Sequence, residues 1–353
     1  MPPVTLPTIV VVGGIRGHYV KLAALQPPAQ ASARAHWLFV DTGQHYDPKM
    51  AQQYRDEYQL YVDHALACGD AGASPVQTLA SMLVACEDLL DRVRPDACVV
   101  LGDANTTLAA ALAAARLRIP IAHLEAGVRT PSGHHEEVNR TLVDELSGLH
   151  VASSRRDLEM LQKEGRGPSS RLGGDLTRDL CLTLTGERPD PAAPGHALVT
   201  LHRTENTKNS EVLRAAIAAV DDAGLPGVLV LHPRVRQLIA ESRLRLQSGW
   251  RVHDSLPHGR MLRILRDARV VITDSGALQR ESYYLHVRAV VVQDFPFWPE
   301  LTQSGFHVSV APGGDIGGAL TRALQPAPPV EIDFGPAPAG PASVGLVEEW
   351  VCG

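Results

Sequence analysis

Residues 120–148, PIAHLEAGVRTPSGHHEEVNRTLVDELSG, bring carboxylates, histidines and arginines together in one short stretch. Glu125 follows a strand-like apolar run. Glu136 and Arg140 are four positions apart, so they share one face if their segment is helical. Side chains of these types can transfer protons or hold an anion, or they can simply be a solvated helix start with a salt bridge. The stretch therefore predicts either an acid/base site or an exposed helix start.

A metal site is a third interpretation, and the spacing does not favour it. His134 and His135 are adjacent and point in different directions, and neither HExxH nor His-x-His occurs. Five widely spaced cysteines without a CxxC pair suggest neither a zinc site nor a disulfide framework. We therefore predict no metal, no cofactor, and reduced thiols of the kind found in a cytoplasm.

Two carboxylates occupy equivalent places after apolar runs. Asp103 ends ACVVLGD as Glu125 ends IPIAHLE, and the polar NTT after Asp103 is able to cap the Ala-rich helix expected next. Carboxylates brought together in a partly dry cleft have pKa values that are pushed apart, so that one becomes an acid and the other a base. The alternative is that Asp103 only begins a helix.

The first two loops carry further candidates. In GGIRGHYVK a glycine turn lets backbone N–H groups approach a phosphate, while Arg16 and Lys21 supply positive charge; the alternative is a plain strand-to-helix turn. Gln44 and His45 follow the second run, in DTGQHYD, as candidate contacts to a sugar or second site. A surface histidine is the alternative there.

The second half repeats this arrangement. LVTLHRTEN places His202 and Arg203 after an apolar run. In ITDSGALQRES, Ser275 and Gly276 at a helix start suit a phosphate, and Glu281 is placed for a ribose hydroxyl. A catalytic serine is the competing interpretation, but no GxSxG surrounds Ser275.

The elements that position these residues are short β-branched runs alternating with helix-length segments. Runs that are apolar on both faces indicate parallel sheets covered on both sides, whose ligands lie beyond the carboxyl ends of the strands. A Pro- and Gly-rich linker follows LTLTG, and alternation then restarts. We predict an α/β fold with two Rossmann-like doubly wound domains facing a cleft. The predicted domains are 1–180 and 181–335, followed by a closing segment and helix, 336–353, that packs back on the first.

Composition excludes some classes of protein. The 353 residues are 44% hydrophobic and 20% charged, with a net charge of −6, so nucleic-acid binding through phosphate neutralisation is not supported. No basic region precedes the first apolar run, which is too short for a membrane span. A cytoplasmic protein without membrane or nucleic-acid partners is expected.

Seven segments together resemble the UDP-N-acetylglucosamine 2-epimerase family, in order and over nearly the whole chain. They are GIRGHYVK, TGQHYD, LGDANTTLAAALAA, IAHLEAGVRT, EEVNRTLVDELSGLHVASS, LVTLHRTEN and ITDSGALQRES. The resemblance implies two Rossmann-like domains in the glycosyltransferase-B arrangement, a nucleotide-sugar substrate and a homodimer.

The resemblance also implies roles for matching positions. The acid/base carboxylates around the sugar would be Asp103, Glu125 and Glu136, with Arg140 and His202 holding the diphosphate leaving group and the reacting sugar. Nucleotide and diphosphate contacts would come from Arg16, Lys21, Arg203, Met261, Ser275, Gly276 and Glu281. The implied reaction removes the C2 proton and expels the nucleoside diphosphate anti to it, leaving a glycal.

Two outcomes follow from that intermediate. Non-hydrolysing members add the diphosphate back and give the C2 epimer, whereas hydrolysing members add water and release UDP and N-acetylmannosamine. The activator-site histidine of non-hydrolysing bacterial members is Val230 here, with His232 at the following asparagine position, so the hydrolysing outcome is slightly preferred. A glycosyltransferase of the same architecture and a decayed nucleotide-sugar binding protein are the alternatives.

Several positions depart from the family pattern. His18 stands where glutamate is common and joins Gln44 and His45 as a candidate sugar or second-site contact. Met261 replaces a frequent phenylalanine, which removes an aromatic surface for the base. Asp175 replaces asparagine, and QDFPFWPE replaces the usual RDTTERPE loop. The general chemistry is therefore better predicted than the exact substrate.

Overall fold

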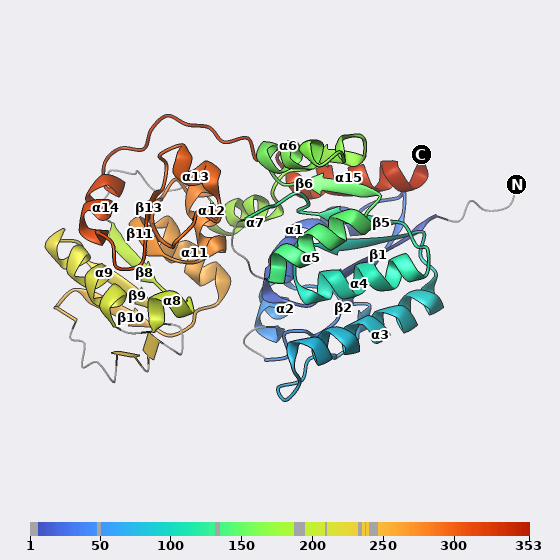
Figure 1. Ribbon diagram of the computed structural model, residues 1–353, viewed down its shortest axis with the longest axis horizontal. Helices are drawn as coiled ribbons and strands as arrows, with labels where there is room; N and C mark the ends of the chain where they lie inside the picture. Colours follow the sequence, from blue (N-terminus) through green and yellow to red (C-terminus); the bar gives the residue numbers. More distant parts are fainter. Residues whose placement is uncertain are drawn as a thin grey trace, which may run out of the picture. The chain divides into compact units, whose positions relative to one another are not determined.

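The computed structural model describes residues 6–47, 51–130, 135–186, 195–208, 210–231, 235–236, 238–239 and 246–353. The chain forms two compact units (Figure 1). The first contains residues up to Leu180 together with Asp333–Gly353, and the second contains Cys181–Ile332. Each unit is built around one parallel sheet.

The sheet of the first unit has seven parallel strands in the order β3-β2-β1-β4-β5-β6-β7. The order reverses between β1 and β4, and ligands of such sheets bind at the carboxyl edge next to a reversal of this kind. The strands are β1 Thr8–Gly13, β2 His36–Asp41, β3 His64–Ala65, β4 Ala97–Leu101, β5 Ile121–Leu124, β6 Leu149–Ala152 and β7 Ser170–Leu172.

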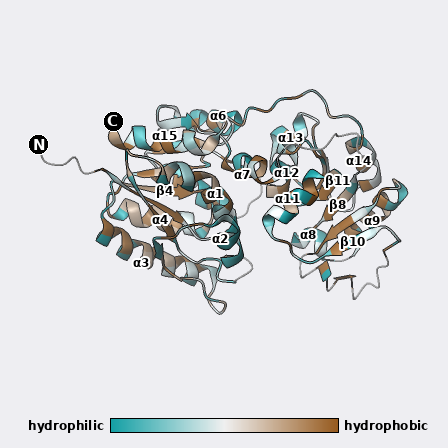
Figure 2. Ribbon diagram, turned by 180° about the vertical axis from the view of Figure 1, so that it is seen from behind, coloured by the Kyte–Doolittle hydropathy of each residue, from teal (hydrophilic) through white to brown (hydrophobic). Residues whose placement is uncertain are grey.

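Helices cover both faces of this sheet, which is why its strands are apolar on both sides. Strand β4 is buried at all five positions, and the hydrophobic colouring of the strands contrasts with the mixed helices (Figure 2). The helices are α1 Arg16–Gln30, α2 Gln52–Tyr58, α3 Pro75–Val93, α4 Asn105–Arg116, α5 His135–Leu146, α6 Arg155–Lys163, α7 Leu176–Thr185 and α15 Ala339–Cys352, with a 3₁₀ turn at Gly167–Ser169.

The Ala-rich helix is capped by a residue from another loop, and not by its own NTT segment as expected. Helix α4 begins at Asn105, but its N-cap is Ala104, and no side chain of the NTT segment caps it. Instead Gln44, from the loop after β2, accepts a hydrogen bond from the Thr106 N–H at 2.9 Å. A tertiary contact has therefore replaced the local cap.

The second unit holds a six-stranded parallel sheet in the order β10-β9-β8-β11-β12-β13, which reverses between β8 and β11. Its strands are β8 His196–Thr200, β9 Gly227–Val230, β10 Trp250–His253, β11 Ala268–Thr273, β12 Arg288–Val292 and β13 Val308–Val310. Its helices are α8 Thr204–Thr207, α9 Glu211–Asp222, α11 His258–Arg266, α12 Gly276–Tyr284, α13 Pro299–Gln303 and α14 Ile316–Ala323.

The C-terminal helix α15 belongs to the first unit, where it packs on α1. A Cβ on Gly340 would lie 2.2 Å from the carbonyl oxygen of Ala24, so only glycine permits this approach. The buried carboxylate of Glu348 accepts hydrogen bonds from the Trp37 indole at 3.1 Å and the Ser32 hydroxyl at 2.5 Å. These contacts tie the end of the chain to its beginning.

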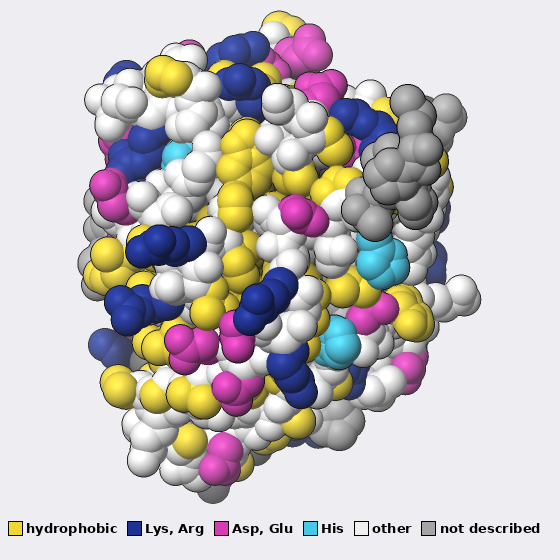
Figure 3. Space-filling view, turned by 90° about the vertical axis from the view of Figure 1, so that its right-hand side faces the viewer, with side chains coloured by type: hydrophobic (Ala, Val, Ile, Leu, Met, Phe, Trp, Pro, Cys, Tyr) yellow, Lys and Arg dark blue, Asp and Glu magenta, His cyan; other side chains and the backbone are white. Residues whose placement is uncertain are grey.

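The surface of the first unit is mixed (Figure 3). Hydrophobic side chains form a band across the face shown there, with basic and acidic groups beside it. Among the described residues, we find no helix whose length and apolar character would let it span a bilayer.

The stability of the second unit is expected to fall as pH drops from about 6.5 to about 4. Burial lowers the pKa of His307 from 6.5 to about 4, and its Nδ1 accepts the Ala289 N–H at 3.0 Å, a bond that protonation would break. The unfolded chain takes up the proton first, so unfolding becomes easier across this window by on the order of 3 kcal/mol.

Urea unfolding followed at several pH values measures this effect. In His307→Gln the free energy of unfolding should depend less steeply on pH than in wild type. The exposed His36→Gln should keep the wild-type dependence. Equal slopes in wild type and His307→Gln would contradict the assignment.

Candidate active site

Two neighbouring strand ends carry the carboxylates singled out from the sequence. Gly102, before Asp103, has φ +60°, and Glu125 itself has φ +67°, an uncommon conformation for a residue with a side chain. The backbone N–H groups of Glu125 and Ala126 both donate to the Val151 carbonyl, at 2.9 and 3.2 Å. Two hydrogen bonds to β6 thus hold Glu125 in its strained conformation.

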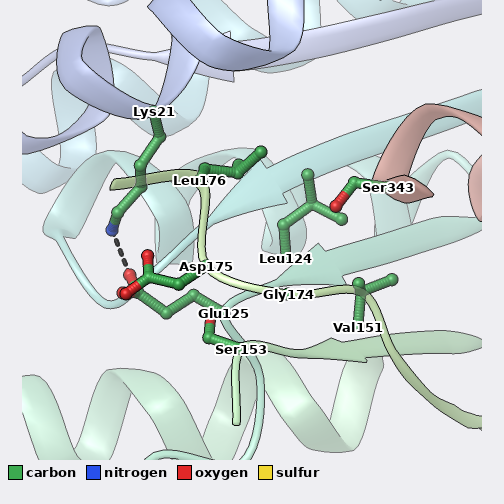
Figure 4. Close-up of a pocket in the computed structure, with 9 residues that line it drawn as sticks. All are labelled: Lys21, Leu124, Glu125, Val151, Ser153, Gly174, Asp175, Leu176 and Ser343. Carbon is green, nitrogen blue, oxygen red and sulfur yellow. Dashed lines mark hydrogen bonds and ion pairs between the residues drawn. The ribbon is translucent and has the colours of Figure 1, made fainter. Parts of the chain in front are cut away.

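Glu125 forms an ion pair with Lys21 of α1, and both side chains are about five-sixths buried, with 16% and 15% exposed. A Cβ on Gly102 would lie 3.1 Å from both charged groups, so the loop after β4 closes over the pair. The pair lies in a pocket (Figure 4). The pocket is lined by Lys21, Leu124, Glu125, Val151, Ser153, Gly174, Asp175, Leu176 and Ser343.

Asp103 is held by α5. Arg140, whose side chain is 5% exposed, forms ion pairs with Asp103 and with Glu137. The Asn139 amide donates to the Asp103 carbonyl at 2.8 Å. Glu137 also accepts from the Thr130 N–H at 2.9 Å, which connects α5 to the loop after Glu125. Asp103 is therefore fixed both at its backbone and at its carboxylate.

Arg140 pairs with a different glutamate of α5 from the one that the i,i+4 spacing suggests. Arg140 pairs with Glu137 at i−3, whereas Glu136 at i−4 has a side chain that is 39% exposed and lies 3.5 Å from the ring of His135. Sequence reasoning overlooked Glu137, although i,i+3 pairs are as compatible with a helix as i,i+4 pairs. His134 lies outside the described residues.

His123 and Asp144 form a fully buried pair that contacts the loops after β4 and β5. Nδ1 of His123 lies 2.6 Å from Asp144, and Nε2 lies 2.8 Å from the Gly102 carbonyl. Burial alone would raise the pKa of Asp144, but His123 and Arg129 hold it well below its usual range. A histidine inside an apolar strand signals that a buried partner exists, but the sequence does not tell which residue it is.

Two side chains of the loop after β2 accept hydrogen bonds from the first turns of neighbouring helices. Gln44 caps α4 through the Thr106 N–H. Nδ1 of His45 accepts the Arg16 N–H at 3.2 Å and so caps α1. Burial and the charge of Arg16 lower the pKa of His45 to about 4, so this imidazole stays neutral. Gln44 and His45 thus contact helix N-termini of their own unit.

His18 lies on α1 and is 1% exposed, with Nδ1 making no hydrogen bond within the part of the chain that the structure describes. Burial and the nearby charge of Lys21 lower its pKa to about 3. Gly14, in the same segment, faces the hydroxyl of Thr42, which a Cβ would meet at 2.0 Å. This glycine therefore allows close packing of the loop.

Asp274 organises the strand ends of the second unit. It is fully buried and accepts the backbone N–H groups of His202 and Arg203 at 3.0 and 2.9 Å, and the Asn206 amide at 2.9 Å. Its carboxylate also lies 2.9 Å from Nδ1 of His202. Burial alone would raise the pKa of Asp274, but the hydrogen bond and charge of His202 outweigh it and lower the pKa. Asp274 therefore orients His202.

Asp274→Asn is expected to lower kcat by about 10- to 100-fold with a small change in KM, because residues that orient a predicted site histidine, as Asp274 orients His202, commonly have effects of this size. Steady-state kinetics measure both quantities. The exposed Asp294→Asn is the matched control, and wild-type kinetics in Asp274→Asn would contradict this role.

The start of α12 is capped and lies beside aromatic rings. The Ser275 hydroxyl accepts the Leu278 N–H at 3.4 Å. The Trp298 indole donates to the Gly276 carbonyl at 2.8 Å, and a Cβ on Gly276 would lie 3.4 Å from the ring of Phe297. The Arg203 guanidinium lies 5.6 Å from the centre of that ring. The altered loop QDFPFWPE thus packs directly on the predicted phosphate segment.

Glu281 is 2% exposed, and its carboxylate lies 2.7 Å from Nε2 of His258. Met261 lies on the same helix as His258, α11, and is partly buried. Val230 ends β9 in the core, and His232 lies outside the described residues. Within the described residues no three His, Cys, Asp or Glu side chains gather as a metal site would require.

The chain matches known proteins over most of its length. Residues 29–331 match the family model described as UDP-N-acetylglucosamine 2-epimerase. The chain is 31% identical over 326 residues to UDP-2,3-diacetamido-2,3-dideoxy-D-glucuronate 2-epimerase of Pseudomonas aeruginosa, covering 87% of this chain and 89% of that protein. It is 29% identical over 334 residues to UDP-N-acetylglucosamine 2-epimerase of Methanocaldococcus jannaschii, with 88% and 90% covered.

Solved structures confirm the predicted fold class. The crystal structure of the Methanocaldococcus jannaschii UDP-GlcNAc 2-epimerase in complex with UDP-GlcNAc and UDP has a TM-score of 0.84 at 24% identity, with 98% of this chain and 100% of that chain covered. The glycosyltransferase SnogD from Streptomyces nogalater has a TM-score of 0.58 at 16% identity, with 98% and 93% covered. Both likenesses concern the fold. The family match over residues 29–331 and the 31% identity over most of the Pseudomonas protein show that this chain belongs to the UDP-N-acetylglucosamine 2-epimerase family.

Proposed function

We propose that this protein removes the C2 proton of a UDP-linked sugar and expels the diphosphate anti to it, forming a glycal. The observation that carries the proposal is the pair of strand-end carboxylates, Asp103 and Glu125, each matched to a buried cation, Arg140 and Lys21. A sugar C2–H is a weak acid, so its removal needs a positioned carboxylate and a strongly stabilised leaving group.

On the first unit, the proposal gives acid/base roles to Asp103, Glu125 and Glu136. Arg140 is assigned to the reacting sugar and leaving group, while Arg16 and Lys21 are assigned to the diphosphate. The partly exposed carboxylate of Glu136 supports its role, because a base must reach its substrate. His18, Gln44 and His45 stay predictions as sugar or second-site contacts.

On the second unit, His202 is assigned to the leaving group, where Asp274 orients its ring. Ser275, Gly276, Arg203 and Glu281 are assigned to the diphosphate and ribose. The N-terminus of α12 supports this, because backbone N–H groups there favour an anion. The position of Met261 is assigned to the base.

We favour UDP-N-acetylglucosamine or a closely related sugar as substrate, with release of UDP and N-acetylmannosamine. Support comes from the names of the relatives and from Val230 at the position of the activator-site histidine. The non-hydrolysing outcome, giving UDP-N-acetylmannosamine, is the alternative. A cytoplasmic location and a homodimer stay predictions from the sequence.

The experiment is NMR of the reaction in deuterated water with a panel of nucleotide sugars. The panel contains UDP-N-acetylglucosamine and UDP-2,3-diacetamido-2,3-dideoxy-D-glucuronate, the sugar in the name of the Pseudomonas relative. Deuterium at C2 of the product is expected, and free N-acetylmannosamine separates hydrolysis from epimerisation. Turnover that needs an acceptor and leaves C2 unlabelled would instead identify a glycosyltransferase. If no member of the panel exchanges its C2 hydrogen with solvent, the proposal is wrong.

A further inference from the structure

We propose that Glu125 takes up a proton when the substrate's diphosphate draws Lys21 away from it, and that Asp175 is a further site residue that promotes this uptake. The inference rests on the proposed function, because it requires Lys21 to bind the diphosphate. It makes Glu125 an acid of the site and leaves Asp103 and Glu136 to act as bases.

The first observation is that Lys21 is already engaged. Its ammonium group pairs with Glu125, and only 15% of the Lys21 side chain is exposed. A diphosphate in this pocket therefore competes directly with the Glu125 carboxylate for the same cation. Two negative charges on one ligand, with Arg16 on the same helix, favour the diphosphate in that competition.

The second observation is the carboxylate of Asp175. This residue is 1% exposed, lines the same pocket, and points toward the Lys21–Glu125 pair (Figure 4). Its Oδ1 accepts the Thr177 N–H at 2.9 Å, which fixes the side chain at the start of α7. Two carboxylates thus face one ammonium group in a largely buried pocket.

The other titratable groups around Glu125 do not replace Lys21. His18 on α1 is buried and neutral, because its pKa is lowered to about 3. His45, from the loop after β2, is neutral as well, with a pKa lowered to about 4. Asp103, on the loop after β4, is paired with Arg140 of α5. Lys21 is therefore the cation whose ion pair with Glu125 the diphosphate would break.

The consequence follows from electrostatics. An opposite charge a few ångströms away lowers a carboxyl pKa by about 1–3, and a like charge raises it. When Lys21 leaves, Glu125 keeps the like charge of Asp175 and loses its cation, so its carboxylate binds a proton from solvent. Asp103 keeps its ion pair with Arg140. Glu125 therefore becomes an acid only when the diphosphate is present, while Asp103 keeps its role as a base.

The test is calorimetric titration of UDP at about pH 6 in two buffers that differ in ionisation enthalpy, which gives the protons taken up per UDP bound. Wild type should take up between roughly a half and one proton more than Glu125→Gln. UDP-N-acetylglucosamine, whose diphosphate has no group that titrates near the pH of the experiment, should give the same difference, which assigns it to Glu125. Asp103→Asn should keep the wild-type uptake.

Two variants test the partners. Asp175→Asn should bind UDP with a smaller uptake than wild type. Lys21→Met should bind UDP more weakly and with no extra uptake, because its Glu125 is already protonated before UDP arrives. UDP binding with the same proton balance in wild type and Glu125→Gln would overturn the inference and leave nucleotide binding intact. Failure of wild type to bind UDP would overturn both the inference and the proposed function.

Discussion

Glu125→Gln is expected to lower kcat by about 10³-fold and to abolish C2 deuterium incorporation, because acid/base side chains typically contribute 10²- to 10⁴-fold. Glutamine keeps the size of the side chain and a hydrogen-bond acceptor for Lys21, so the loss isolates the proton-transferring group. Quenched-flow product assays and NMR in deuterated water measure both effects.

The control is Glu87→Gln, an exposed residue of α3, whose kcat should equal that of wild type. The Tm of Glu125→Gln should fall only modestly, because Lys21 loses its charged partner while the side-chain shape and the backbone contacts to Val151 stay in place. A Glu125→Gln enzyme with at least a tenth of wild-type kcat would refute an acid/base role for this residue.

Arg140→Met is expected to reduce kcat/KM by about 10³-fold and also to destabilise the first unit. Its guanidinium joins Asp103 and Glu137, and its removal leaves two partly buried carboxylates without their shared cation. Breaking a buried pair costs about 3–5 kcal/mol; Asp103 is 30% exposed, so about 2 kcal/mol and several degrees of Tm are expected here.

Arg140→Lys separates charge from geometry. Lysine keeps the positive charge but cannot hold both carboxylates in a fork, so most of the stability should return while kcat/KM stays at least about tenfold below wild type. Calorimetry and steady-state kinetics on the same preparations measure the two quantities. Full activity in Arg140→Lys would show that charge alone suffices at this position.

The sequence predicts the strand ends well because their signals are local. Runs such as ACVVL and IAHL are apolar at every position except His123, which indicates parallel strands buried on both faces, and the residues after such a run must lie at the carboxyl edge. This reasoning places Asp103 and Glu125 on adjacent loops. Their chemical roles stay predictions.

The partners of these residues could not be predicted, because contacts distant in sequence decide them. Gln44 caps a helix 62 positions away, and Asp274 orients a histidine 72 positions away. Asp144 has the sequence character of an exposed helix residue, yet it is fully buried under His123. Single-sequence patterns report periodicity and local caps, whereas burial of a charge depends on tertiary packing.

The placement of α15 has a consequence for synthesis on the ribosome. Ser343 on this helix lines the pocket of Glu125, so part of the pocket wall is translated only after the second unit. The whole second unit, Cys181–Ile332, emerges in between, which at cellular translation rates takes on the order of ten seconds. Throughout that interval the nascent first unit exposes the face of α1 that Gly340 later covers. The nascent chain therefore acquires the Ser343 side of this pocket only after the whole second unit has been synthesised.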